Sequence, residues 1–268
     1  MERLHPSHTR RALASLALVA CALSACATPP IRLAPAFPLG AVRVYSLSIR
    51  GVTAAEDRPG VREETSLEAR WTVEVLEVDG DASTLRLTLT PLRFLRDGRE
   101  TDLDEQSVRA VVGPDGTVRS VEAEGGIVSE VLQPDEIVPL LGQPLPTEEL
   151  HVGSRWSRAL ATAGTVGPVE QTGRLSALRV EEGYDTAVVI VGTHRPLTIT
   201  RQVGEQPVTL AGDEVSTSEI AFALREGFPV VITTHARGRF EVQGFGTPTG
   251  GAFTIETERV LRLLEPSP

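Results

Sequence analysis

Polar and apolar residues alternate along most of the chain after residue 41, and this pattern restricts the fold more than any other sequence feature. The clearest run has apolar residues at every second position: Leu67, Ala69, Trp71, Val73 and Val75. Successive side chains of a β-strand point to opposite faces, so this spacing indicates a strand with one buried face. Such strands are typical of antiparallel sheets. We therefore expect a mainly β protein built from antiparallel sheets.

Similar runs continue to the C-terminus and are separated by short stretches that contain glycine. The predicted strands around the clearest run are Tyr45–Ile49, Leu85–Leu89, Val108–Val112 and Thr117–Val121. Those of the second half are Arg155–Ala163, Val169–Val180, Thr186–His194, Val215–Arg225, Val230–Val242 and Ala252–Leu264. Asp79–Asp81 and Gly113–Gly116 have the composition of hairpin turns.

The middle of the chain has a different pattern. Apolar residues in Ile127–Leu141 are spaced for one or two short helices, and an irregular loop is the alternative. Together with the Pro144/Pro146 stretch, this segment divides the body into a first β half, 41–124, a crossover, 125–150, and a second β half, 151–268. We expect a curved sheet or an open barrel whose halves are joined by short central helices.

The two halves resemble each other in outline. Trp71–Arg93 and Gly173–Arg195 are each a strand, an acidic turn with glycine and a second strand. Val108–Val121 and Ile220–Thr233 are both hairpins around a turn with glycine. These parallels indicate a diverged duplication. The alternative is that unrelated β meanders look alike.

The first 25 residues have the composition of a signal peptide. Arg3, Arg10 and Arg11 precede the apolar run Ala12–Leu23, which is too short to span a bilayer as a helix. The sequence that follows, Leu23-Ser24-Ala25-Cys26, resembles the lipobox of bacterial lipoproteins. The resemblance implies that Cys26 receives diacylglycerol and that Leu23, Ser24 and Ala25 are recognised by the signal peptidase.

Two further observations bear on this interpretation. Cys21 would leave with the signal peptide, so lipidation of Cys26 would remove the last free thiol from an oxidising envelope. Ala27 replaces the aspartate that tends to retain lipoproteins at an inner membrane. We therefore expect a cell-envelope protein that is anchored by its lipid, in the outer membrane if the organism has two. An ordinary secretory signal with an incidental cysteine is the alternative.

Two further short segments of the sequence are of interest. Residues 26–40 are rich in proline and suggest an extended tether between lipid and body. Leu150–Trp156, with a Val-x-x-Gly-x-x-Trp-like pattern, weakly resembles a segment of uncharacterised β-rich envelope lipoproteins. That resemblance implies no catalytic residue.

The charge of the chain excludes some partners. The full chain has 36 acidic and 26 basic residues and a net charge of −10, and every basic residue other than histidine is arginine. The predicted signal peptide removes three of these arginines, so the mature protein is more acidic still. An acidic body argues against binding to nucleic acid.

Motifs that carry enzymatic or metal chemistry are absent from the sequence. The histidines of the body, His151, His194 and His235, have no second ligand at metal spacing, and we expect them at surface or turn positions. Neither a nucleophile elbow nor a phosphate-binding loop occurs. We therefore predict no catalytic residue, no cofactor and no metal.

These observations favour a non-enzymatic binding protein for lipid or another apolar ligand. The alternative is a structural or assembly partner of other envelope proteins, and an enzyme is the third class. A continuous apolar cavity of lipid size would favour the carrier, and a filled core the assembly partner. A buried cluster of acidic residues and histidine would favour the enzyme.

The lipobox interpretation predicts that Cys26→Ser abolishes lipidation, because a serine hydroxyl cannot replace the thiolate as acceptor of the lipid. Labelling with a radioactive fatty acid measures this directly. A serine variant that incorporates as much label as the wild type would place the anchor elsewhere.

Overall fold

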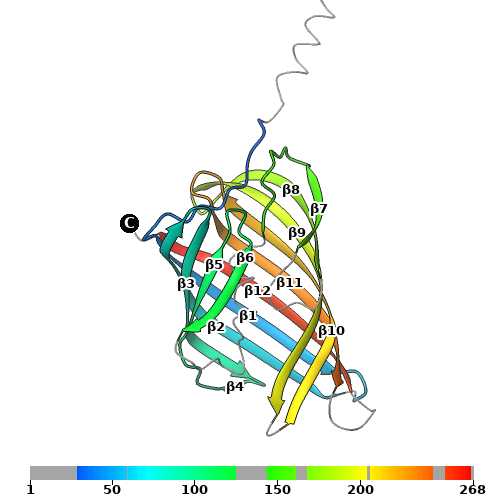
Figure 1. Ribbon diagram of the computed structural model, residues 1–268. Coiled ribbons are helices and arrows are strands. Elements are labelled where there is room, and N and C mark those ends of the chain that lie inside the picture. Colours follow the sequence, from blue (N-terminus) through cyan, green and yellow to red (C-terminus); the bar gives the residue numbers. More distant parts are fainter. Residues whose placement is uncertain are drawn as a thin grey trace, which may run out of the picture.

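The computed structural model describes residues 29–58, 60–124, 144–160, 168–203, 206–243 and 251–266. Within these residues the protein consists of strands that form a single 12-stranded sheet, with antiparallel pairing throughout (Figure 1). The prediction of a mainly β, antiparallel fold is confirmed. No helix in this part of the chain is long and apolar enough to cross a membrane.

The strands of the first half are β1 (Val42–Ala55), β2 (Arg62–Asp79), β3 (Ala82–Arg96), β4 (Arg99–Glu100), β5 (Gln106–Val112) and β6 (Val118–Glu124). Those of the second half are β7 (Arg155–Leu160), β8 (Val169–Glu181), β9 (Tyr184–Val203), β10 (Gln206–Ala223), β11 (Phe228–Gln243) and β12 (Ala252–Pro266). The predicted signal peptide and lipobox, and the predicted helices in Ile127–Leu141, lie outside the described residues.

The chain enters the sheet at its centre. The strand order is β6-β5-β3-β2-β1-β12-β11-β10-β9-β8-β7, with the short β4 beside β3. The first half therefore runs from the centre to one edge, and the second half returns from the other edge to the centre. The sheet curves so that its two halves partly face each other, in agreement with the expected curved sheet (Figure 1).

The alternating pattern determines which face of the sheet is buried. Every second residue of β2 from Leu67 to Val75 is buried, and its partners on β3, from Leu85 to Leu89, are buried too. Buried residues on β8–β11, among them Leu175, Val189 and Ile220, belong to the same core cluster. The inner faces of both halves therefore bury one shared core.

The predicted turns occur where glycine permits a left-handed backbone. Residues 80–81 join β2 to β3, and residues 113–117 join β5 to β6, as predicted. Glu182 and Gly183, between β8 and β9, have φ angles of 49° and 83°. Positive φ at both central positions is the conformation of the two-residue hairpin turn. Asp97 and Gly98, between β3 and β4, form a second such turn that the sequence analysis did not identify.

The prediction for the end of β9 was wrong. The predicted strand Thr186–His194 ended at His194, but β9 continues through Pro196 to Val203. Proline lacks an N–H and is tolerated in a strand where one side has no partner. The pairing of β8 with β9 reaches only to Glu170 opposite His194, so within the described residues Pro196 has a strand neighbour only on the β10 side.

The strand order agrees with the proposed duplication. The segments compared in the sequence correspond to β2–β3 and β8–β9, and to β5–β6 and β10–β11, in the same order along the sheet. The lengths have diverged, since β5 has 7 residues and β10 has 18. The duplication stays a prediction.

Gly173 allows a close cross-strand contact that we expect to be required for stability. It pairs with Trp156, and a Cβ at residue 173 would lie 2.0 Å from Cζ2 of that indole. Gly173→Ala should therefore lower the free energy of unfolding by about 1–3 kcal/mol, the usual cost of overpacking. Chemical denaturation measures this free energy.

The matched control is the same substitution in a Trp156→Ala background, where the cost should largely disappear. An equal cost in both backgrounds would show that the indole is not the cause.

An apolar pocket beneath the N-terminal strap

Residues 31–41, which we call the strap, pack against one end of the curved sheet. Ile31 and Leu150 exchange backbone hydrogen bonds of 2.9 and 2.8 Å, and Leu33 is only 1% exposed. The Ala36 amide donates to the Gly227 carbonyl at 2.8 Å. The blue segment of Figure 1 follows this path. From Ile31 onward the segment expected to form the tether, 26–40, therefore lies against the body, where Leu33 is buried.

The strap can approach the turn between β10 and β11 closely only because residue 227 is a glycine. This residue has a φ of +69°, and a Cβ there would lie 2.6 Å from the Ala36 Cβ and 2.7 Å from the Ala34 oxygen. Any other residue would push the strap away or strain the turn between β10 and β11. The strap is therefore an integral part of this end of the protein.

The described end of the crossover packs at the same place. Leu145 and Leu150 are both 3% exposed, and the Leu145 amide donates to the Asp115 carbonyl at 3.1 Å. The Arg158 guanidinium donates to the carbonyl oxygens of Pro144 and Leu145. Strap and crossover together cover one end of the shared core.

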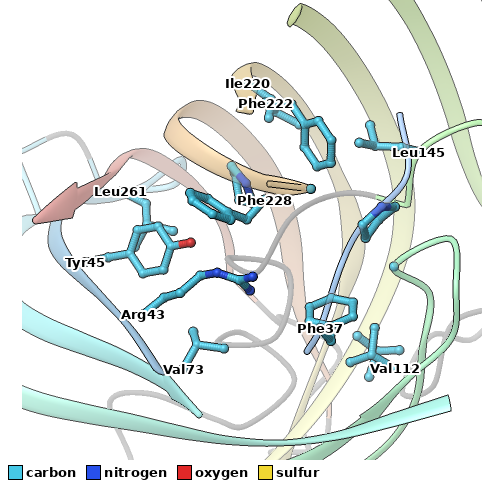
Figure 2. A pocket seen from close by; sticks show the side chains of 15 residues that line it. Phe37, Arg43, Tyr45, Val73, Val112, Leu145, Ile220, Phe222, Phe228 and Leu261 are labelled. Carbon is cyan, nitrogen blue, oxygen red and sulfur yellow. The ribbon is translucent and has the colours of Figure 1, made fainter. Parts of the chain in front are cut away.

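A pocket of about 40 Å³ lies beneath the strap, between the two halves of the sheet (Figure 2). Its walls come from the strap, from strands of both halves and from the crossover: Phe37, Tyr45, Val73, Val112, Leu145, Phe222 and Phe228. All of these side chains are apolar or aromatic. The pocket is therefore a break in an otherwise apolar core, enclosed by segments distant in sequence.

Three of the residues that line the pocket, Tyr45, Val112 and Phe222, lie beside β-bulges. The register shifts between Val44 and Tyr45 in the β1–β12 pair, next to Val112 in the β5–β6 pair, and next to Phe222 in the β10–β11 pair. A bulge changes the direction of a side chain relative to a regular strand, and bulges are frequent beside functional sites. These irregularities therefore shape the pocket locally.

Arg43 is the charged residue of the pocket and is only 7% exposed. Its Nη2 donates to the Ala36 oxygen at 3.0 Å, and its guanidinium carbon lies 4.4 Å from the centre of the Phe228 ring. Among the described residues it makes no ion pair with a carboxylate. Figure 2 shows its guanidinium between Phe228 and Val73, directed into the pocket.

Burial affects both ionisable groups of this wall. Burial lowers the pKa of the Arg43 guanidinium, and the electrostatic influence of Tyr45 and Tyr184 partly offsets this. Burial also raises the pKa of the Tyr45 hydroxyl, which therefore stays neutral. The pocket accordingly contains a desolvated cation beside a neutral phenol.

The size of the pocket limits what it can hold. A site for one water molecule needs at least about 10–15 Å³, and pockets for drug-sized ligands measure about 300–1,000 Å³. At about 40 Å³ the pocket can hold a small polar group or a few carbon atoms. It is not the lipid-sized cavity expected of a carrier, so a whole acyl chain would require the strap to move.

The residues considered for chemistry in the sequence lie elsewhere. His151, His194 and His235 are all exposed, as expected. His194 lies between two carboxylates, with Nε2 3.4 Å from Asp213 Oδ1 and Nδ1 3.9 Å from Glu170 Oε2. The side chains of His194, Glu170 and Asp213 are each about half exposed or more, so these residues do not form a buried catalytic cluster.

The structure also locates the possible metal ligands and the two tryptophans. No group of three His, Cys, Asp or Glu within the described residues is placed to hold a metal ion. Trp71 is fully buried, as its place in the alternating run predicted, and Trp156 packs against the core.

Sequence reasoning missed Arg43, although a signal was present. Tyr45, Leu47 and Ile49 define the inner face of β1, and two residues back along the same face is Arg43. An arginine at an inward position of an apolar face is costly unless it has a partner, so it merits attention as a candidate site residue.

Comparisons with known proteins give little further identification. No family model matches the chain, and no curated protein matches it. A solved structure described as "Lipid-protein interactions in lipovitellin" is similar over 87% of this chain and 26% of that chain, with 14% identity and a TM-score of 0.49. This chain therefore spans about a quarter of that chain's length. A likeness at this level says nothing about what this pocket binds.

The position of the strap predicts unequal effects for its two leucines. Leu33→Ala should lower the free energy of unfolding by about 2–5 kcal/mol, because it opens a cavity beneath a buried side chain. Leu39→Ala should change it by less than about 0.5 kcal/mol, since Leu39 is 69% exposed. Thermal and chemical unfolding of the two variants compare these effects. Equal stabilities would mean that the strap is not docked in solution.

Proposed function

We propose that this protein is a lipid-anchored envelope protein that binds a small apolar or amphipathic molecule without turning it over. The observation that carries the proposal is the pocket beneath the strap, with its aromatic and aliphatic walls from both halves of the sheet. Apolar walls with a few polar groups are the usual composition of a small-molecule site.

The proposed anchor would place this site near the bilayer. Cys26 precedes Ile31 by five residues, and an extended chain covers at most about 3.6 Å per residue. If Cys26 carries the lipid, the strap therefore begins within roughly 20 Å of the membrane surface. An amphipathic ligand could then pass between bilayer and pocket over a short distance. The outer membrane is the proposed location where two membranes exist.

A second candidate function follows from the two ends of the sheet. β6 and β7 each have one strand neighbour along the path within the described residues. An unpaired strand edge can accept a strand from another protein. On this alternative the protein is an assembly partner of other envelope proteins, and the pocket is a packing defect.

Ligand binding can be tested with octanol, a neutral amphiphile with a short chain. The mature chain with Cys26→Ser, produced with a secretory signal, needs no detergent and suits calorimetry. We expect octanol to bind, because each methylene that enters the pocket contributes about 0.8 kcal/mol. Val112→Phe, which fills the pocket, should weaken binding at least about tenfold at similar folding stability, a loss of about 1.4 kcal/mol.

Val111→Phe, on the opposite face of the same strand, is the matched control and should bind as the wild type does. If octanol and octanoate both fail to bind, and cross-linking in cells traps one specific protein, the binding proposal is wrong and the assembly role replaces it.

A further inference from the structure

A buried cation that has no carboxylate partner among the described residues is the least expected feature of the pocket. Arg43 is 7% exposed and pairs across β1 and β2 with Val73, which is also buried. Removing a guanidinium from water is costly unless hydrogen bonds or an opposite charge replace the lost hydration. Its side chain donates to the Ala36 carbonyl and lies over the Phe228 ring.

These contacts leave most N–H donors of the guanidinium available for hydrogen bonds to a ligand. An arginine has five N–H donors in a planar fork, and the Ala36 carbonyl takes one of them. The guanidinium carbon lies over the Phe228 ring, and this contact uses none of its N–H donors in a conventional hydrogen bond. The electrostatic influences on Arg43 come from the hydroxyls of Tyr45 and Tyr184, and among the described residues no carboxylate contributes.

The geometry points to an anionic headgroup as the occupant of this pocket: we propose that Arg43 selects an amphiphile whose alkyl chain ends in a carboxylate. This inference rests on the proposed function and specifies the ligand class of the same site. Arginine binds a carboxylate through two parallel hydrogen bonds, which a neutral headgroup cannot match. The apolar walls formed by Phe37, Val112 and Phe222 would face the carbons next to the carboxylate, and the rest of the chain would require the strap to move.

The size of the pocket favours carboxylate over phosphate. A volume of about 40 Å³ suits a planar group of three heavy atoms better than a tetrahedral group of five. Both anions share the chemistry that a guanidinium recognises, and they would come from different sources, a free fatty acid or a phospholipid. The test therefore compares both headgroups on the same short chain.

The experiment is calorimetric titration of the mature Cys26→Ser chain at pH 7 with octanoate, octyl phosphate, octanol, octylamine and acetate. Octanoate should bind about tenfold to a hundredfold more tightly than octanol, the usual effect of a charge-assisted hydrogen-bonded pair. Octylamine, which is a cation at this pH, should bind more weakly than octanol. Acetate, which has no chain, should bind far more weakly than octanoate.

Variants separate a binding role from a structural one. Arg43→Gln can still donate to the Ala36 carbonyl, so it should lose the preference for octanoate while its affinity for octanol changes less than about threefold. Arg43→Lys keeps the charge and should keep part of the preference. Arg32→Gln removes an exposed strap arginine that pairs with Glu149 at 3.2 Å, and it should behave as the wild type does.

Distinct outcomes overturn the inference and the proposed function. Octanol binding without any preference for octanoate, or equal loss of both ligands in a folded Arg43→Gln variant, would reject Arg43 as the headgroup residue. Tighter binding of octyl phosphate would reject the carboxylate. If none of the alkyl ligands binds, the proposed function itself fails. Should Arg43→Gln not fold, the order of octanoate, octanol and octylamine with the wild type still decides the question.

Discussion

The pairing of the first strand with the last holds the structure together. β1 and β12 are hydrogen-bonded from Arg43 opposite Pro266 to Ala55 opposite Phe253. This ladder joins two meanders into one sheet, and its curvature brings their inner faces into contact around one core. The pocket depends on it directly, because Tyr45 and Leu261 come from these two strands. Without the ladder, each meander would leave its apolar face uncovered.

Much of the fold could be predicted because alternation is a local property. The pattern Leu67, Ala69 and Trp71 identifies an inner face without knowledge of any partner strand. The same is true of turns such as Glu182-Gly183, whose backbone angles follow from residue type. Non-local features were not predictable in this way. The pairing of β1 with β12, and the continuation of β9 past Pro196 where β8 has ended, depend on neighbours far away in sequence.

The candidate site was harder to predict than the fold for the same reason. Proline content suggested a tether, whereas the strap position depends on Leu33 finding a buried site and on Gly227 leaving room for Ala36. Arg43 could have been identified by extending the inner face of β1 backward, but the absence of a carboxylate beside it in the described part of the chain emerges only from the assembled walls. One guanidinium thus links two features of this end, since it holds the strap carbonyl and faces the pocket.

The central position of β1 also has a consequence for the order of folding. Ribosomal synthesis produces β1 long before β12, its neighbour on one side, and contacts of such large sequence separation form slowly. Until the last strand arrives, β2 can cover one edge of β1 while the other edge stays open, in the middle of what will become the sheet. The nascent protein therefore exposes its future centre until the final strand pairs with β1 and completes the sheet.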